Sequence, residues 1–239
     1  MIEKGRFLVV FFSRKFLIFI APIYTHSPMK MICVTLFGVI ALACFSPANA
    51  QETNTSARPT WNHSLENDFY FYKDEFLYLP IYSANKDRLH LEARYNYEDL
   101  KTVSAWGGYN FTGGNDFEYT ITPMAGFVAG NINGLAPGLE FDFGYKGFEL
   151  YSESEYVFDF KEKENDFFYN WTDLSYSPTD WLWFGLSGQM TKSYQADLEF
   201  EPGLLLGGGY RWFELTGYAY NLGGDDTFVM LSLTVNFPE

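Results

Sequence analysis

Acidic side chains recur at every second position in several stretches of the 239-residue chain. Glu153 and Glu155 are two residues apart, and on an extended strand this spacing puts both carboxyl groups on one face, about 7 Å from each other. Two carboxyls so arranged can serve as the acid and base of glycoside hydrolysis. Alternate acids are more typical of a hydrated wall, so the pattern predicts an acidic surface and not a catalytic pair.

Other groups that could carry catalysis are few. After residue 50 the histidines are His63 and His90, and neither belongs to a serine–histidine or histidine–aspartate arrangement that would support a hydrolase. His90 and Glu92 suit metal binding, but two residues are an unspecific signal. The glycines at 207–209 precede a turn, whereas a phosphate-binding loop precedes a helix. We therefore predict no enzyme, no catalytic residues, no cofactor and no metal site.

Composition excludes two further classes. The chain is 47% hydrophobic and 21% aromatic, which is incompatible with disorder. It carries 16 Lys and Arg against 30 Asp and Glu, a net charge of −14. Affinity for nucleic acid depends on basic residues that displace counterions, so no nucleic-acid partner is expected.

Residues 1–50 read as a leader. The apolar stretch 32–45 follows Lys30 and ends in small residues that suit signal peptidase, so cleavage is predicted after Ala50 and Met29 is the predicted true start. Loss of this leader removes five bases, one acid and both cysteines. The remaining 11 bases and 29 acids give a net charge of −18, with no disulfide or thiolate chemistry.

From residue 88 onward, apolar residues recur at every second position, which is typical of strands with one apolar face. The last such stretch is the clearest: Val229, Leu231 and Leu233 alternate with Met230 and Ser232. We predict ten strands of about ten residues, the length that crosses a bilayer when tilted. The predicted strands are 89–97, 102–111, 117–127, 139–145, 148–158, 167–177, 181–191, 197–208, 212–221 and 227–237.

The links between these strands alternate in length. Short links are expected on one side, at 112–115, 146–147, 178–180 and 209–211, and longer polar links on the other. Pro123 and Pro202 fall inside strands, where we expect bulges. Strand 167–177 is ambiguous, because Asn170 and Thr172 share a face with Leu174, so a bulge or a shorter strand is expected there. Residues 51–87 are too aromatic for a free tail and are predicted to form a periplasmic arm, cap or partial plug.

The chain resembles small bacterial outer-membrane β-barrel proteins. The resemblance rests on the signal ending Ala48-Asn49-Ala50, on the alternation from Leu89 onward, and on a last strand that ends in the aromatic residue Phe237. It implies an all-β, up-and-down antiparallel transmembrane barrel over residues 88–239 in the outer membrane of a Gram-negative-type bacterium. The implied partners are outer-membrane lipid and lipopolysaccharide, the barrel-assembly machinery, and small cationic solutes.

In such a barrel the polar face of each strand points inward, which predicts an acidic lumen. Carboxylates in a lumen must be hydrated, bind cations or take up protons, and rings of acids favour cations in a pore. The alternatives are a closed network in which His90, Arg94 and hydroxyl groups satisfy the acids, an outer-membrane enzyme acting on lipid or glycan, and a soluble periplasmic β-sandwich that binds a ligand. The predicted lumen and cation-binding residues are Glu92, Arg94, Glu118, Glu140, Asp142, Glu149, Glu153, Glu155, Glu199, Glu201, Glu214 and His90.

Overall fold

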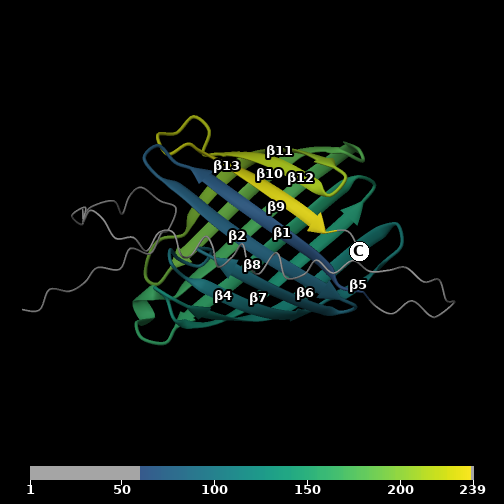
Figure 1. Cartoon of the computed structure of the whole chain (residues 1–239). Coiled ribbons are helices and arrows are strands. Elements are labelled where there is room, and N and C mark those ends of the chain that lie inside the picture. The colour runs from purple at the N-terminus through teal and green to yellow at the C-terminus, as the bar shows by residue number, and fades with distance from the viewer. Residues whose placement is uncertain (1–59, 238–239) are drawn as a thin grey trace, which may run out of the picture. The chain divides into compact units, whose positions relative to one another are not determined.

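The computed structural model describes residues 60–237, which form one closed antiparallel β-barrel (Figure 1). The leader and its predicted cleavage site lie outside the described residues. A short 3₁₀ helix, η3 (Lys163–Asn165), lies in one loop. The strands are β1 (Asn62–Phe71), β2 (Phe76–Lys86), β3 (Leu89–Tyr95), β4 (Val103–Tyr109), β5 (Phe111–Gly114), β6 (Phe117–Ala129), β7 (Gly134–Tyr145), β8 (Phe148–Asp159), β9 (Phe167–Thr179), β10 (Leu182–Ser193), β11 (Glu199–Tyr210), β12 (Phe213–Tyr220) and β13 (Phe228–Phe237).

The ring closes because the first strand pairs with the last, as Figure 1 shows for β1 and β13. Strands β4 and β5 both pair with β6, and Gly108↔Met124 and Phe111↔Ile121 belong to one continuous register. They are therefore two halves of one strand, and the ring in the described residues has twelve members. Closure leaves no strand edge, which is the condition for a sheet to lie in lipid.

The predicted arm over residues 51–87 is wrong for residues 62–86, because these residues form β1 and β2. Strand β1 pairs with β13 from His63 to Phe71, and it pairs with β2 over its whole length. Without these two strands, β3 and β13 would expose unpaired backbone groups to the membrane. This is why the strand count is twelve where the sequence predicted ten.

The connections differ in length between the two ends of the barrel. At one end they are two-residue turns, and Asp87, Lys146 and Arg211 adopt the left-handed backbone (φ 53°, 48° and 57°) that such tight hairpins require. At the other end they contain four to seven residues, at 72–75, 96–102, 130–133, 160–166, 194–198 and 221–227. Outer-membrane barrels have short turns on the periplasmic side, so the predicted asymmetry is confirmed, and the two ends are called periplasmic and extracellular below.

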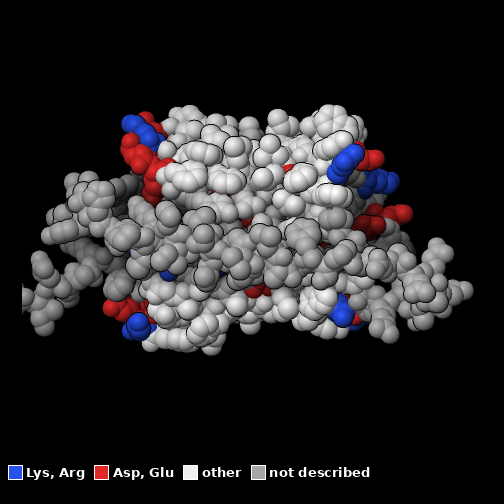
Figure 2. Space-filling model, viewed as in Figure 1, with Lys and Arg blue, Asp and Glu red and all other residues white. Residues whose placement is uncertain are grey.

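The outer surface is apolar between the two ends. Charged side chains gather at the ends of the barrel, with a largely uncharged face between them (Figure 2). Leu204, Leu206 and Leu186 point outward from this band, each at least half exposed. No helix within residues 60–237 is long and apolar enough to cross a membrane. Exposed aromatic side chains lie beside the periplasmic turns, as the sequence predicted, and form a girdle of Phe111, Phe117, Tyr145, Phe148, Tyr176, Phe213 and Phe237.

The bulges predicted at Pro123 and Pro202 are absent. Pro123 lies opposite the interruption between β4 and β5, and the ladder keeps its register on both sides of it. Pro202 lies just beyond the point where β11 begins to pair with β12, so little pairing is lost. Each proline lacks a backbone N–H donor, but each lies where the ladder is interrupted or begins. Neither position therefore needs the extra residue of a bulge.

The irregularity of strand β9 is a register shift against β10 between Tyr176 and Thr179, and the strand keeps one register over 167–176, where Asn170 and Thr172 do face outward. Their polar groups are satisfied by neighbours on β8. The Asn170 amide donates to the Ser152 and Ser154 hydroxyls, each at 2.9 Å, and the Thr172 hydroxyl donates to the Asn170 carbonyl oxygen at 3.1 Å. We call these four residues the outer polar cluster. Mutual hydrogen bonding makes polar side chains tolerable on this surface.

Candidate functional site

The lumen contains a cavity of about 540 Å³. It exists because the inward positions of the strands carry polar residues, while the alternate positions carry the outer apolar band. Among the described residues that line it, seven carboxylates face one guanidinium and one imidazole. They are Glu66, Glu92, Glu140, Glu149, Glu153, Asp173 and Glu214, with Arg94 and His90.

The cavity leads toward the periplasmic end. A second cavity of about 330 Å³ lies at the turn Lys146-Gly147, and the two share Glu149 and Ser177 in their walls. Glu118 and Asp116 line the outer part of this second cavity. The charged groups that line this second cavity are therefore Asp116, Glu118, Lys146 and Glu149.

Arg94 is the centre of the charged network. Its guanidinium lies 2.5 Å from Glu153 Oε1 and 2.5 Å from Glu92 Oε2, and Glu140 and Glu155 follow at 3.6 and 3.4 Å. One positive charge is thus shared among four carboxylates, which come from β3, β7 and β8. The planar fork of arginine suits such a position, because its donors point in several directions at once.

Aromatic rings complete the surroundings of Arg94. Its guanidinium carbon lies 4.5 Å from the ring centre of Tyr97 and 4.7 Å from that of Trp106. The Tyr97 hydroxyl also donates to Glu153 at 3.0 Å. Arg94 is only 3% exposed, so its charge depends on these partners and not on water.

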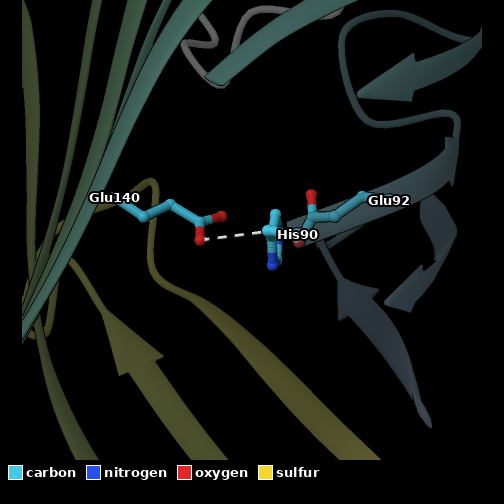
Figure 3. Close-up of side chains that lie close together, drawn as sticks. All are labelled: His90, Glu92 and Glu140. Atoms are coloured by element: carbon cyan, nitrogen blue, oxygen red, sulfur yellow. Dashed lines mark ion pairs between the residues drawn. The ribbon is translucent and has the colours of Figure 1, made fainter. Parts of the chain in front are cut away.

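His90 extends the network toward the periplasmic side. Figure 3 shows its ring between Glu92, on the same strand, and Glu140, which reaches in from β7. The His90 Nε2 atom lies 3.2 Å from Glu92 Oε1 and 3.9 Å from Glu140 Oε2. These three side chains form a compact group whose ligand atoms all lie within 4.8 Å of one another.

The extracellular half of the lumen is filled largely by apolar and aromatic side chains, together with the buried acids Glu98, Glu155 and Glu201. Tyr220, Met230 and Val128 are there with no exposed surface, and Phe228 is 2% exposed. We call this set the apolar layer. It consists of Tyr70, Leu77, Leu79, Trp106, Met124, Val128, Ile132, Ala136, Val157, Phe167, Tyr169, Trp171, Leu205, Tyr218, Tyr220, Phe228 and Met230.

One contact of the apolar layer crosses the lumen. Tyr97 meets Tyr169 edge to face at 5.9 Å between ring centres, although the two lie on opposite walls. Phe228 stacks on Tyr220, its partner on the neighbouring strand, at 4.8 Å between ring centres, and it meets Tyr72, in the first extracellular loop, in a tilted arrangement at the same distance. Burial raises the pKa of Tyr72, so this phenol is uncharged at neutral pH. The layer therefore packs uncharged groups at the extracellular end of the cavity, beside the buried carboxyl groups of Glu98 and Glu201.

All twelve residues predicted for the lumen occupy inward positions. His90, Glu92, Arg94, Glu140, Glu149, Glu153 and Glu214 line the main cavity, and Glu118 lines the second. The others are dispersed: Glu155 is buried beside Arg94, Asp142 lies on β7 toward the periplasmic turn, and Glu199 and Glu201 lie at the extracellular end of β11.

Sequence reasoning missed three inward acids. Glu66 and Asp68 were assigned to the arm, although Ser64, Glu66 and Asp68 alternate with Leu65, Asn67 and Phe69 as in any other strand. Asp173 was missed because the facing of its strand was ambiguous. It accepts hydrogen bonds from Ser187, Trp171 and Tyr218.

Comparisons with known proteins support the fold. No family model and no curated protein matches the chain. Among solved structures, the KdgM porin covers 74% of this chain and 99% of its own length, at 10% identity and a TM-score of 0.53. A second KdgM structure, with disordered oligogalacturonate, gives 10% identity over 73% of this chain and 99% of its own, with a TM-score of 0.55. The NanC porin gives 9% identity over 73% of this chain and 100% of its own, with a TM-score of 0.54.

The closed ring, the apolar outer band and the asymmetry of the turns define an outer-membrane β-barrel protein. The predicted class is thereby confirmed, and its strand count is corrected from ten to twelve. The β-sandwich alternative is wrong, because the strands form one closed ring and not two facing sheets.

Proposed function

We propose that this protein is a narrow, cation-preferring barrel in the outer membrane, whose charged cavity faces the periplasm and whose extracellular end is closed by the apolar layer. The observation that carries the proposal is the imbalance of charge in the cavity wall, where seven carboxylates face one guanidinium and one imidazole. Carboxylates in a confined lumen attract cations and repel anions.

The apolar layer sets the size of what can pass. Uncharged side chains packed across a lumen exclude water and ions, so passage requires these side chains to move. A small cation reaching the cavity from the periplasm meets this barrier only after it has passed the carboxylates. In this proposal the carboxylates determine which ions enter the cavity, and the apolar layer determines how readily they pass through the barrel.

Substrate chemistry distinguishes this barrel from one structural neighbour. The KdgM porin has been solved with oligogalacturonate, which is a chain of acidic sugars. An acidic lumen repels such a polyanion, so the likeness in fold does not extend to this solute. The proposed solutes are small and positively charged, and the proposed surroundings are outer-membrane lipid with lipopolysaccharide, reached through the barrel-assembly machinery.

Planar bilayer recording tests the proposal. The wild-type protein is expected to conduct weakly, and the variant Tyr220→Ala with Phe228→Ala to conduct severalfold better because two buried rings are removed from the layer. In a KCl gradient the reversal potential of this variant should have the sign expected of a pore that prefers K⁺ over Cl⁻. Val229→Ala, on the outward face beside Phe228, is the matched control and should leave conductance unchanged.

Two outcomes would contradict the proposal in different ways. A reversal potential on the anion side would refute the cation preference. Silence of both proteins, after correct folding is verified by heat-modifiable gel migration, would favour a closed structural barrel, which is the second candidate that the apolar layer supports.

A further inference from the structure

We infer that His90, Glu92 and Glu140 form a binding site for one divalent transition-metal ion of the zinc type. The inference names a particular cation for the acidic cavity and therefore rests on the proposed function. It can be tested by metal binding without any current. Its first support is geometry. Tetrahedral ligands at about 2.0–2.2 Å from zinc lie about 3.4 Å apart, and His90 Nε2 is 3.2 and 3.9 Å from the two carboxylate oxygens.

The second support is the orientation of the imidazole. His90 Nδ1 lies 2.8 Å from Asn85 Oδ1, which also accepts a hydrogen bond from the Asn110 amide at 2.9 Å. The Asn110 carbonyl oxygen in turn accepts from the Thr122 hydroxyl at 2.7 Å. The Asn85 oxygen is therefore an acceptor, so Nδ1 carries the proton. A second hydrogen-bonding residue that fixes the tautomer in this way is typical of histidines that bind metals.

This tautomer leaves the lone pair of His90 Nε2 in the cavity. His90 is 6% exposed, and its Nε2 atom is buried without a hydrogen-bond partner. It lies beside two carboxylates that can donate nothing when ionised. A bare nitrogen lone pair beside two anions is unfavourable unless a proton or a metal cation lies between them.

The third support is that Arg94 contacts only one oxygen of each of the two carboxylates. Arg94 contacts Glu92 through Oε2 and Glu140 through Oε1. The opposite oxygens, Glu92 Oε1 and Glu140 Oε2, are the two that face His90 (Figure 3). Each carboxylate thus has one oxygen on the guanidinium and one that faces His90, and of these two only Glu92 Oε1 has a further partner among the described residues, the Ser83 hydroxyl at 3.2 Å. One arginine shared among four carboxylates leaves ample negative charge for a divalent ion.

The ligand set indicates the class of metal. One imidazole nitrogen with two carboxylate oxygens suits zinc and its neighbours, whereas magnesium and calcium favour oxygen alone. All three side chains line the main cavity, so water can complete the coordination and the ion can enter from the periplasmic end.

Zinc titration of the purified, chelator-treated protein in detergent tests the inference. Calorimetry should show one site per chain, with zinc bound at least tenfold more tightly than magnesium. His90→Gln and Glu140→Gln should each weaken zinc binding at least tenfold. Asn85→Ala should weaken it about 10- to 100-fold through the loss of ring orientation. Glu214→Gln is the control, because it neutralises a carboxylate of the same cavity outside the group.

Cobalt substitution provides a readout that does not depend on affinity alone. Cobalt in the wild-type site should give a visible absorption band that is lost in His90→Gln, while gel migration of both proteins shows a folded barrel. The inference is overturned if zinc does not bind the folded wild type, or if Glu214→Gln weakens binding as much as Glu140→Gln. The latter result would mean that the cavity only collects cations by its charge, and it would leave the proposed function standing.

Discussion

Arg94 Nη1 lies 2.5 Å from Glu153 Oε1, and this contact joins β3 to β8 across the lumen. Both residues are almost fully buried, at 3% and 5% exposure. Breaking a buried ion pair by removing one member leaves the other charge without compensation, which costs far more than the intact pair contributes. Arg94 is therefore the residue on which the acidic lumen most depends for its stability.

Replacement of Arg94 by methionine should lower the free energy of unfolding by about 3–5 kcal/mol. The reason is that Glu92, Glu140, Glu153 and Glu155 then share one cavity without a guanidinium. Urea unfolding in lipid vesicles, followed by tryptophan fluorescence, measures the change. Arg88→Met, in an exposed periplasmic turn, is the control and should cost less than about 1 kcal/mol. Equal effects of the two substitutions would show that the Arg94 network adds no stability.

A charge on the outer band should be costly if that band faces lipid. Leu204 is half exposed and lies in the middle of β11. Leu204→Arg should destabilise the barrel by about 2–4 kcal/mol, whereas Leu222→Arg, in the last extracellular loop, should cost about 0–1 kcal/mol. Unfolding in vesicles again measures both. If Leu204→Arg lowered the free energy of unfolding no more than Leu222→Arg, the conclusion that the apolar band faces lipid would be contradicted.

The outer polar cluster allows a test by combined substitution. Asn170→Ala removes the amide that donates to Ser152 and Ser154, and it should destabilise the barrel by about 1–3 kcal/mol because their hydroxyls lose a partner in an apolar setting. Adding Ser152→Ala, Ser154→Ala and Thr172→Val should recover most of the loss, because no polar side chain of the cluster is then left unpaired. Failure to recover stability would mean that these hydroxyls find other partners when Asn170 is absent.

Much of the barrel was predictable because alternation is a direct consequence of a sheet with lipid on one side and water on the other. Strands 148–158 and 227–237 have this character, and the structure has β8 and β13 there. Short links at one end were predicted from the breaks in this alternation, at 112–115, 146–147, 178–180 and 209–211, and the structure has two-residue turns at 115–116, 146–147, 180–181 and 211–212. Every predicted lumen residue consequently has the correct facing.

Alternation fails where both faces of a strand are apolar. In Phe69-Tyr70-Phe71, the phenylalanines face outward and Tyr70 belongs to the apolar layer, so the sequence shows one aromatic run without a period. This is why β1 was taken for an arm. The apolar layer itself was not predicted, because an inward Phe228 or Tyr220 is indistinguishable by type from an outward one.

The site was predictable as a set of inward charges but not as a network. Glu92 and Arg94 are neighbours on β3, and their facing follows from their spacing. Their contacts with Glu140 and Glu153 depend on the ring's closing with twelve strands, which brings β7 and β8 within reach of β3. Strand number and stagger determine such cross-lumen distances, and neither can be read from one strand alone.

The reversal potential of the opened barrel tests the central claim most directly. In the variant that carries both Tyr220→Ala and Phe228→Ala, a tenfold KCl gradient should give a reversal potential with the sign of a cation-selective pore. Adding Glu140→Gln, Glu149→Gln and Glu214→Gln should move it toward zero, because three of the cavity's carboxylates are neutralised. An unchanged potential after these three substitutions would contradict the claim that the lumen carboxylates select the ion.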